Sequence, residues 1–350
     1  MGAPRRLRGS IPCGTRAPCY DTEPLYAIIL SPRLVPVSVS APAEAAPPPL
    51  AVPAEPASAR SGHGGIVLIL LTLLLFVSMD TLVKDLVRRN PAPVLIWLRF
   101  LVHMLVAAAI MLAVPRFRPY IRTKAPVRQL VRSALLMTTT TTFFFGLMYL
   151  KLADLVILTQ AAPLMVVALS VLLLGEKVGP RRWLGVLVGF AGVVIILKPG
   201  FGFEWASLFG IASAVIYAVY QIMTRSLSGA DHTMTTFFYT ASVGAVVMAA
   251  VAPFFWQTPT LTDALLFLLP GIFGGCGHLL LIMAFARSEA SLLAPYFYTV
   301  ILWATLLGWA IFGEVPDVFT FVGAGLIVAA GFYVWHRERR MMKMRGQVRA

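Results

Sequence analysis

Ten apolar runs follow one another between Gly64 and Trp335. A run of about 20 residues, which rises 1.5 Å per residue as an α-helix, spans the ~30 Å hydrocarbon core of a bilayer. The runs predict transmembrane helices at 66–86, 94–114, 129–149, 154–174, 182–197, 206–225, 234–254, 264–285, 290–312 and 316–335. We therefore expect an all-α integral membrane protein with about ten transmembrane helices.

The composition excludes an ordinary soluble domain. Hydrophobic residues make up 59% of the 350 residues and charged residues only 13%, whereas about a quarter of the residues in a soluble domain are charged. The net charge of +14 does not indicate a nucleic-acid partner, because Lys and Arg lie in loops between apolar runs instead of on one soluble face. The three cysteines, two in the tail and one in a predicted helix, form no disulfide framework.

The distribution of Lys and Arg predicts how the chain is oriented, because positively charged loops stay on the cytoplasmic side. With a cytoplasmic N-terminus, 23 of the 29 Lys and Arg residues fall inside and 5 fall outside, with Arg99 left within a helix. The inside set includes Arg132, near the start of the third predicted helix, and the outside set includes Lys84. We expect a multi-pass protein of the inner (plasma) membrane with both termini in the cytoplasm.

The two ends of the chain differ from the apolar region. Residues 1–62 are rich in Pro and Ala, as in SAPAEAAPPPLAVPAEPASAR, and such a segment is expected to be disordered because it cannot bury a core. The apolar stretch Tyr26–Leu30 is too short for the core of a signal peptide, so no cleaved signal is expected. A translation start downstream of this tail is an open alternative. Residues 337–350 form a predicted basic cytoplasmic tail.

An internal repeat divides the apolar region. The segment LLLGEKVGPRRWLGVLVGFAGVVIIL is echoed by AIFGEVPDVFTFVGAGLIVAAGFYV, and an offset of 138 residues pairs Glu176 with Glu314 and Gly185 with Gly323. The two halves, 65–198 and 205–336, then hold about five helices each. Five is an odd number, so the second half must enter the membrane in the opposite orientation.

Loop charges support this inversion. The turn after Glu176 carries Lys177, Arg181 and Arg182, whereas the matching turn EVPD of the second half carries no Lys or Arg. Inverted repeats of this kind are typical of transporters, whose substrate site lies near the membrane midplane between the halves.

The LGE turn, the proline after it, the Gly-rich last helix and the run APYFYTVILWATLLGWAIFGEVPD resemble the EamA-type branch of the drug/metabolite transporter superfamily. The resemblance covers roughly residues 65–335. It implies a transporter of a small organic metabolite, such as an amino acid, a nucleoside-like compound including S-adenosylmethionine, or a vitamin. It also implies that the fifth and tenth helices lie at the periphery of a central cavity. As a departure, Pro163 matches Ile301 and Pro295 lies further upstream, so we expect the halves to kink differently.

Asp80 is a candidate substrate-binding residue because it lies within the first predicted helix. An unpaired charge at that depth costs roughly 2.5–3.5 kcal/mol. Lys84, one helical turn away, and Arg99, in the second helix, are alternative partners. A structural ion pair near the outer interface and a contact with substrate both fit Asp80. Lys84 lies near the end of its run, where it can reach water.

Uncharged polar residues add candidates in the first half. Five threonines at 138–142 cover all sides of the third helix, so one or two can face a cavity, with Thr140 as the candidate; helix packing explains the others. Gln160 precedes Pro163, which frees a backbone carbonyl in the membrane. A glutamine beside such a break suits the lining of a water-filled cavity.

The second half adds aromatic and polar candidates. Tyr217 and Gln221 are four residues apart and share a helix face. His278, Tyr298 and Trp303 complete the set, because small-molecule pockets combine aromatic walls with a few polar groups. Interfacial belts are the alternative for Tyr and Trp. Packing is the alternative for His278 and the other membrane histidine, so we expect no metal and no cofactor.

Four motif residues have structural interpretations. Glu176 and Glu314 each lie at a helix end beside a glycine, where a carboxylate can accept backbone N–H groups. Gly185 and Gly189 form a GxxxG pattern, which lets two helices approach closely. Tight packing within the chain and a homodimer are both consistent with this pattern.

Alternating access, in which the halves rock around a midplane site, is the leading functional hypothesis. The chain has no GxxxxGK[ST] motif for binding ATP. A channel-like or regulatory membrane subunit is the alternative. A membrane-embedded enzyme is disfavoured because the predicted helices contain no HExxH, GxSxG or paired-acid motif.

Overall fold

A computed structural model of the chain describes residues 62–347 except 175–177, 200–201, 228–229 and 289, all within one compact unit. The predicted disordered tail therefore lies almost wholly outside the described residues. In the described part of the chain, ten helical spans are long and apolar enough to cross a membrane. Each predicted helix overlaps one of these spans, so the predicted all-α membrane fold is confirmed.

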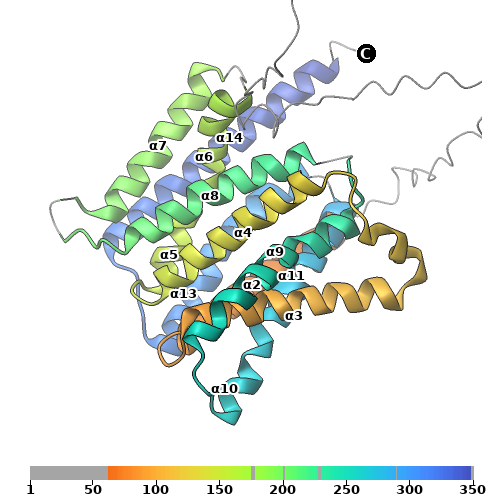
Figure 1. The fold of residues 1–350 in the computed structure, drawn as a ribbon. Helices are drawn as coiled ribbons and strands as arrows, with labels where there is room; N and C mark the ends of the chain where they lie inside the picture. The colour runs from red at the N-terminus through yellow and green to blue at the C-terminus, as the bar shows by residue number, and fades with distance from the viewer. Residues whose placement is uncertain (1–61, 175–177, 200–201, 228–229, 289, 348–350) are drawn as a thin grey trace, which may run out of the picture. The chain divides into compact units, whose positions relative to one another are not determined.

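The spans are built from α-helices and short 3₁₀ segments (Figure 1). The first half contains α2 (Gly62–Leu86), α3 (Ala92–Ala113), η2 (Pro115–Ile121), α4 (Pro126–Leu147), α5 (Leu152–Thr159), α6 (Ala162–Leu174) and α7 (Pro180–Leu197). The second half contains α8 (Ser207–Ser226), α9 (Thr233–Val251), η3 (Ala252–Phe255), α10 (Leu261–Leu266), α11 (Leu268–Arg287), α12 (Ala290–Leu293), η4 (Ala294–Tyr298), α13 (Thr299–Phe312) and α14 (Val318–Gln347). Because α14 continues to Gln347, most of the predicted basic tail extends the last helix.

Interhelix contacts follow the internal repeat. The α3–α9, α5–α13 and α7–α14 contacts each join equivalent spans of the two halves. Exchanging the halves also turns the α2–α11 contact into the α4–α8 contact, and the α3–α11 contact into the α4–α9 contact. Exchanging the two halves therefore reproduces the contacts, as a twofold relation requires.

Equivalent spans run in opposite directions. The Lys151 Nζ atom, just before α5, donates to the backbone oxygen of Val315, just after α13, over 2.8 Å. Lys198, at the end of α7, pairs with Asp317 at the start of α14. In both pairs the start of one span meets the end of its counterpart. The predicted inverted five-plus-five arrangement is therefore confirmed.

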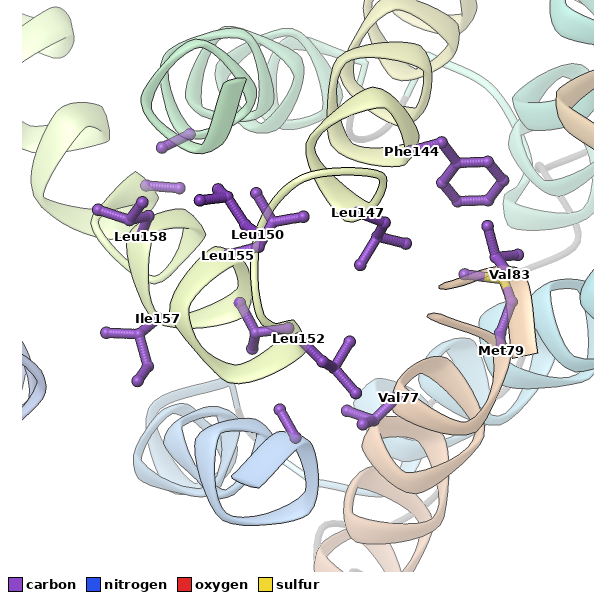
Figure 2. Close-up of a cluster of buried hydrophobic side chains, with 14 of the residues drawn as sticks. Val77, Met79, Val83, Phe144, Leu147, Leu150, Leu152, Leu155, Ile157 and Leu158 are labelled. Atoms are coloured by element: carbon purple, nitrogen blue, oxygen red, sulfur yellow. The ribbon is translucent and has the colours of Figure 1, made fainter. Parts of the chain in front are cut away.

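A buried apolar cluster holds the centre of the unit. Figure 2 shows side chains of α5 pointing toward both α4 and α2. Its labelled residues are Val77, Met79, Val83, Phe144, Leu147, Leu150, Leu152, Leu155, Ile157 and Leu158. Close packing supplies much of the attraction here, because lipid tails are as apolar as these side chains.

Helices α7 and α14 lie side by side (Figure 1), and their close approach depends on glycines. A Cβ atom on Gly192 would lie 2.7 Å from the carbonyl oxygen of Gly323, and a Cβ on Gly189 would lie 1.9 Å from Leu164 Cδ1. A Cβ on Gly185 would meet Val334 at 2.8 Å. The predicted GxxxG pattern thus packs inside the chain, where α7 approaches α14 and α6.

Candidate functional site

The fourth span is broken in the middle. Helix α5 ends at Thr159 and α6 begins at Ala162, with Gln160 as the C-terminal cap. Pro163 has no N–H group to continue the ladder from α5. The Gln160 side-chain amide reaches the other half of the protein, where its Nε2 donates to the backbone oxygen of Phe297 over 3.4 Å.

The ninth span changes from 3₁₀ to α-helix at the equivalent place. Its first turn is the 3₁₀ segment η4, which contains Pro295 and ends at Tyr298, and α13 starts at Thr299. The 138-residue offset of the repeat makes Tyr298 the counterpart of Gln160. The form of the break differs between the halves, as expected from the unmatched prolines, but its position is shared.

A pocket of about 450 Å³ lies at these two breaks. Four of the nine predicted substrate-binding residues line it: Gln160, Tyr217, Gln221 and Tyr298. The remaining polar lining comes from Thr159 and Arg225. Aromatic side chains supply much of the wall, namely Phe285, Phe297, Phe332 and Trp335.

A second polar cluster surrounds Arg99, whose side chain is buried. Its Nη1 donates to Thr140 Oγ1 over 3.3 Å, and its Nε lies 3.3 Å from Met79 Sδ. Asp80 interacts electrostatically with Arg99. Lys84, the other partner that the sequence left open for Asp80, pairs with Glu314, which leaves Arg99 as the candidate partner of Asp80. The cluster joins α2, α3 and α4.

Two histidines adjoin this cluster. The rings of His103 and His278 are stacked with centroids 5.3 Å apart and planes inclined by 22°. Among the described residues, neither nitrogen of the buried His103 ring has a hydrogen-bond partner, and no group of three His, Cys, Asp or Glu side chains is arranged to hold a metal ion. The pair bridges α3 and α11.

Trp303 is not among the residues that line the pocket. It packs against the apolar cluster around Ile69 and Leu73, and in the described part of the chain its buried indole N–H has no acceptor. Its position in α13 therefore does not bring it to the pocket with Tyr298.

The environments of Lys84 and Glu314 differ from those expected from the sequence. Lys84 is only 2% exposed instead of reaching water, and its Nζ lies 2.9 Å from Glu314 Oε2. Its Nζ also donates to the Leu150 carbonyl over 2.5 Å. Glu314 accepts the backbone N–H of Leu152 over 3.1 Å, so it does cap a helix, but the helix is α5 of the other half. Glu176 lies outside the described residues.

Arg132 is a residue that sequence reasoning missed as part of a site. It was counted among the cytoplasmic loop charges, but it lies inside α4 and is only 4% exposed. Its guanidinium donates to Thr224 Oγ1 over 2.8 Å, Thr240 Oγ1 over 3.0 Å and the Tyr220 hydroxyl over 2.6 Å. The arginine follows Pro126 by less than two helical turns, where the apolar pattern has barely begun, so its neighbours give no local signal of burial.

Carboxylates also tie loops together at the two ends of the bundle. At one end, Asp231 accepts from Thr123 Oγ1, Gln129 Nε2 and the backbone N–H of Lys124. Burial alone would raise the pKa of Asp231, but these three hydrogen bonds outweigh it and lower the pKa below the ordinary 3.8. Asp231 is therefore ionised at neutral pH.

At the opposite end of the bundle, Asp263 accepts from Arg89 Nε over 3.0 Å and from Asn90 Nδ2 over 3.3 Å. These bonds join the loop after α2 to the start of α10. Each end of the bundle is thus closed by a carboxylate that links the two halves.

Comparisons with known proteins agree with this architecture. The model of the EamA-like transporter family matches residues 63–198 and again residues 204–335. A solved structure shares the fold with a TM-score of 0.57 and 23% identity, covering 80% of this chain and 99% of the other chain.

Named relatives carry chemically different cargoes. The S-adenosylmethionine uptake transporter of Rickettsia bellii is 30% identical over 223 residues, which cover 63% of this chain and 77% of that protein. The riboflavin transporter of Rhizobium johnstonii is 30% identical over 225 residues, covering 63% and 73%. The pseudopaline exporter CntI of Pseudomonas aeruginosa is 30% identical over 275 residues, covering 76% and 94%.

Proposed function

Because this chain belongs to the EamA-like transporter family and is a multi-pass transporter of a small metabolite, we propose that it works by alternating access around the pocket at the two broken spans. The carrying observation is that Gln160 and Tyr298, equivalent residues of the inverted halves, line the same 450 Å³ pocket. Discontinuous helices at a repeat interface are the usual place for a transported molecule.

The lining suits a small organic molecule. Its volume falls within the range of about 300–1,000 Å³ that small-molecule pockets occupy. Gln160, Gln221 and Tyr217 offer hydrogen bonds, while aromatic side chains offer flat apolar contact. The relatives carry S-adenosylmethionine, riboflavin and pseudopaline, and we place the cargo of this chain in the same class of polar metabolites with a compact organic body.

The Asp80–Arg99 cluster has a separate role in this proposal. It lies on α2, α3 and α4, whereas the pocket residues come from the fourth, sixth, eighth, ninth and tenth spans. Ionisable groups within a membrane mark ion or substrate pathways. We assign Asp80, Arg99, Thr140 and His278 to the path between the pocket and the far side, with Asp80 as the group that any proton coupling would use.

The charge distribution supports an orientation with both termini in the cytoplasm of the inner membrane. The pocket is lined by Arg225, Phe285 and Trp335, which lie toward the C-terminal ends of the sixth, eighth and tenth spans. In this orientation those ends face the cytoplasm. The pocket of this conformation is then accessible from inside.

Counterflow in liposomes tests the proposal. Purified protein is reconstituted, loaded with unlabelled S-adenosylmethionine or riboflavin, and given a trace of the labelled compound outside. A carrier accumulates label transiently, because its binding site brings labelled compound in and returns outward with unlabelled compound bound. A channel-like subunit would give no accumulation. Recovery of chemically unchanged cargo would separate transport from enzymatic turnover.

The variant Gln160→Ala should reduce counterflow at least about tenfold, since a polar contact in a desolvated site contributes roughly 1.4 kcal/mol or more. Tyr298→Ala should act in the same direction. Thr138→Ala is the matched control, because the exposed Thr138 hydroxyl bonds only to the Ala134 carbonyl of its own helix. Normal counterflow in both pocket variants would rule out this pocket as the site of transport.

A further inference from the structure

Arg132 differs from the other buried cations of the spans in its partners. Lys84 is neutralised by Glu314, and Arg99 interacts with Asp80. The hydrogen-bond partners of Arg132 are the neutral oxygens of Thr224, Thr240, Thr236 and Tyr220. In the described part of the chain, no carboxylate lies within ion-pair distance of its guanidinium.

Such an arrangement solvates a positive charge without cancelling it. Burying an arginine within a membrane helix is costly even on insertion scales, and hydroxyl and carbonyl dipoles recover part of this cost while the net charge remains. In a medium of low dielectric constant the field of an uncancelled charge reaches further than it does in water. A site near Arg132 is therefore electropositive.

The aromatic side chains of α8 connect Arg132 to the pocket. The guanidinium carbon lies 4.7 Å from the centre of the Tyr220 ring, and the Tyr220 ring is stacked on Tyr217 with centroids 5.5 Å apart and planes inclined by 17°. Tyr217 lines the pocket. Arg132 thus lies one aromatic layer behind the pocket wall.

The lining adds one cation and two aromatic pairs. Among the described residues it contains Arg225, two turns after Tyr217 on α8, and no Asp or Glu. Phe285 is stacked with Phe297 at 6.2 Å and Tyr298 with Phe332 at 5.8 Å. The pocket therefore combines the α8 wall in front of Arg132 with aromatic pairs from three other helical segments.

We infer that the cargo carries a carboxylate attached to a flat apolar or aromatic body, and that the buried Arg132–Tyr220 pair sets this preference for an anion from behind the pocket wall. The inference rests on the proposed function, because it takes the pocket at the broken spans as the transport site. Arg132 acts as a specificity-determining residue through Tyr220 and Tyr217 and does not itself form the lining.

Matched acids and esters test this preference. Binding of phenylacetate, indole-3-acetate, N-acetyltryptophan and their methyl esters to the full-length protein in detergent is measured by thermal shift and calorimetry, since a compound that binds the folded state raises its unfolding temperature. The acids should bind at least about tenfold more tightly than their esters, the lower end of the effect expected from a focused positive potential. Equal or weaker binding of the acids across the panel would overturn the inference.

Variants then test whether Arg132 causes the preference for acids. Arg132→Gln should lower the affinity for the acids to that of the esters while leaving ester binding within about twofold, and Arg132→Lys should keep part of the preference because it keeps the charge. If Arg132→Gln fails to fold, Arg132→Met removes the same charge. Tyr220→Phe removes only the hydroxyl partner at 2.6 Å, leaves the charge in place and should therefore keep the preference for the acids.

The two proposals fail in distinguishable ways. Loss of acid and ester binding together in Gln160→Ala, with an unchanged acid preference in Arg132→Gln, would retain the pocket and overturn the role of Arg132. Unchanged binding of both compounds in Gln160→Ala would instead remove the pocket from the transport pathway. Arg225→Gln serves as a comparison, because Arg225 lines the pocket directly whereas Arg132 lies behind its wall.

Discussion

Lys84 and Glu314 come from opposite halves of the chain and meet 2.9 Å apart. Glu314 also accepts the N–H of Leu152 at the start of α5, where the positive end of a helix favours an anion. Three separate segments are therefore joined at one carboxylate. Local sequence around Lys84 favours a snorkelling lysine, because nothing within its own helix reveals a partner that the inverted repeat brings from the ninth span.

Removing either partner of this ion pair should have unequal effects. Glu314→Gln leaves a lysine ammonium that is 2% exposed without its counter-ion, and breaking a buried pair in this way costs about 3–5 kcal/mol. Lys84→Met should cost less, about 1–2 kcal/mol, because Glu314 keeps the Leu152 N–H and the charge of Arg88. Thermal unfolding in detergent compares the two variants.

The double variant provides the control. Combining Lys84→Met with Glu314→Gln should raise the unfolding temperature above that of Glu314→Gln alone, because the unpaired buried charge is gone. If Glu314→Gln unfolded at the temperature of the unmodified protein, the pair would not stabilise the fold.

At the scale of helices, the sequence predicts a close helix contact at α7 but does not identify α14 as the partner. The GxxxG spacing predicts that some helix approaches α7 closely. It does not say whether that helix belongs to the same chain. The structure assigns the contact to α14, where Gly192 and Gly323 bring the two backbones together. The repeat offers a reason, since α7 and α14 are equivalent spans related by the twofold exchange.

Gly192→Ala should destabilise the protein. Its Cβ would lie 2.7 Å from a backbone oxygen, which cannot rotate away as a side-chain end can, so the helices must separate at a cost of about 1–3 kcal/mol. Gly325→Ala, on α14 with nothing within 4 Å of its Cβ, is the matched control and should leave the unfolding temperature unchanged or slightly higher. Equal effects of the two substitutions would argue against close backbone contact.

Several pocket residues could be predicted from the pattern of single helices. Gln160 was predicted from its place beside a proline break, and Tyr217 with Gln221 from their shared helix face, and all three line the pocket. Residues whose environment depends on distant segments were missed or misplaced. Arg132 was assigned to a loop because charge near a helix start usually is in water, and Trp303 was grouped with Tyr298 although helical rotation turns it toward Ile69.

For the molecule as a whole, the odd number of spans in each repeat makes the two halves physically distinct in spite of their similarity. Equivalent loops face opposite compartments, so positive charge is tolerated in one copy and avoided in the other. This explains why the turn before α7 is basic while the turn before α14 carries no Lys or Arg. The Lys151 contact with Val315 fixes the turn before α14 at the end of the bundle where α5 begins.

Cysteine labelling of these two turns tests the inversion. In a variant whose three native cysteines are replaced by alanine, Gly179→Cys and Val315→Cys place one thiol in each exposed turn. In right-side-out vesicles, a membrane-impermeant maleimide should label Val315→Cys at once and Gly179→Cys only after permeabilisation, because five spans separate equivalent turns by an odd number of crossings. The reverse pattern would keep the inverted repeat and place the termini outside. Labelling of both thiols from one side would be incompatible with oppositely oriented halves. It would then also contradict a transport site that Gln160 and Tyr298 share as equivalent residues of inverted halves.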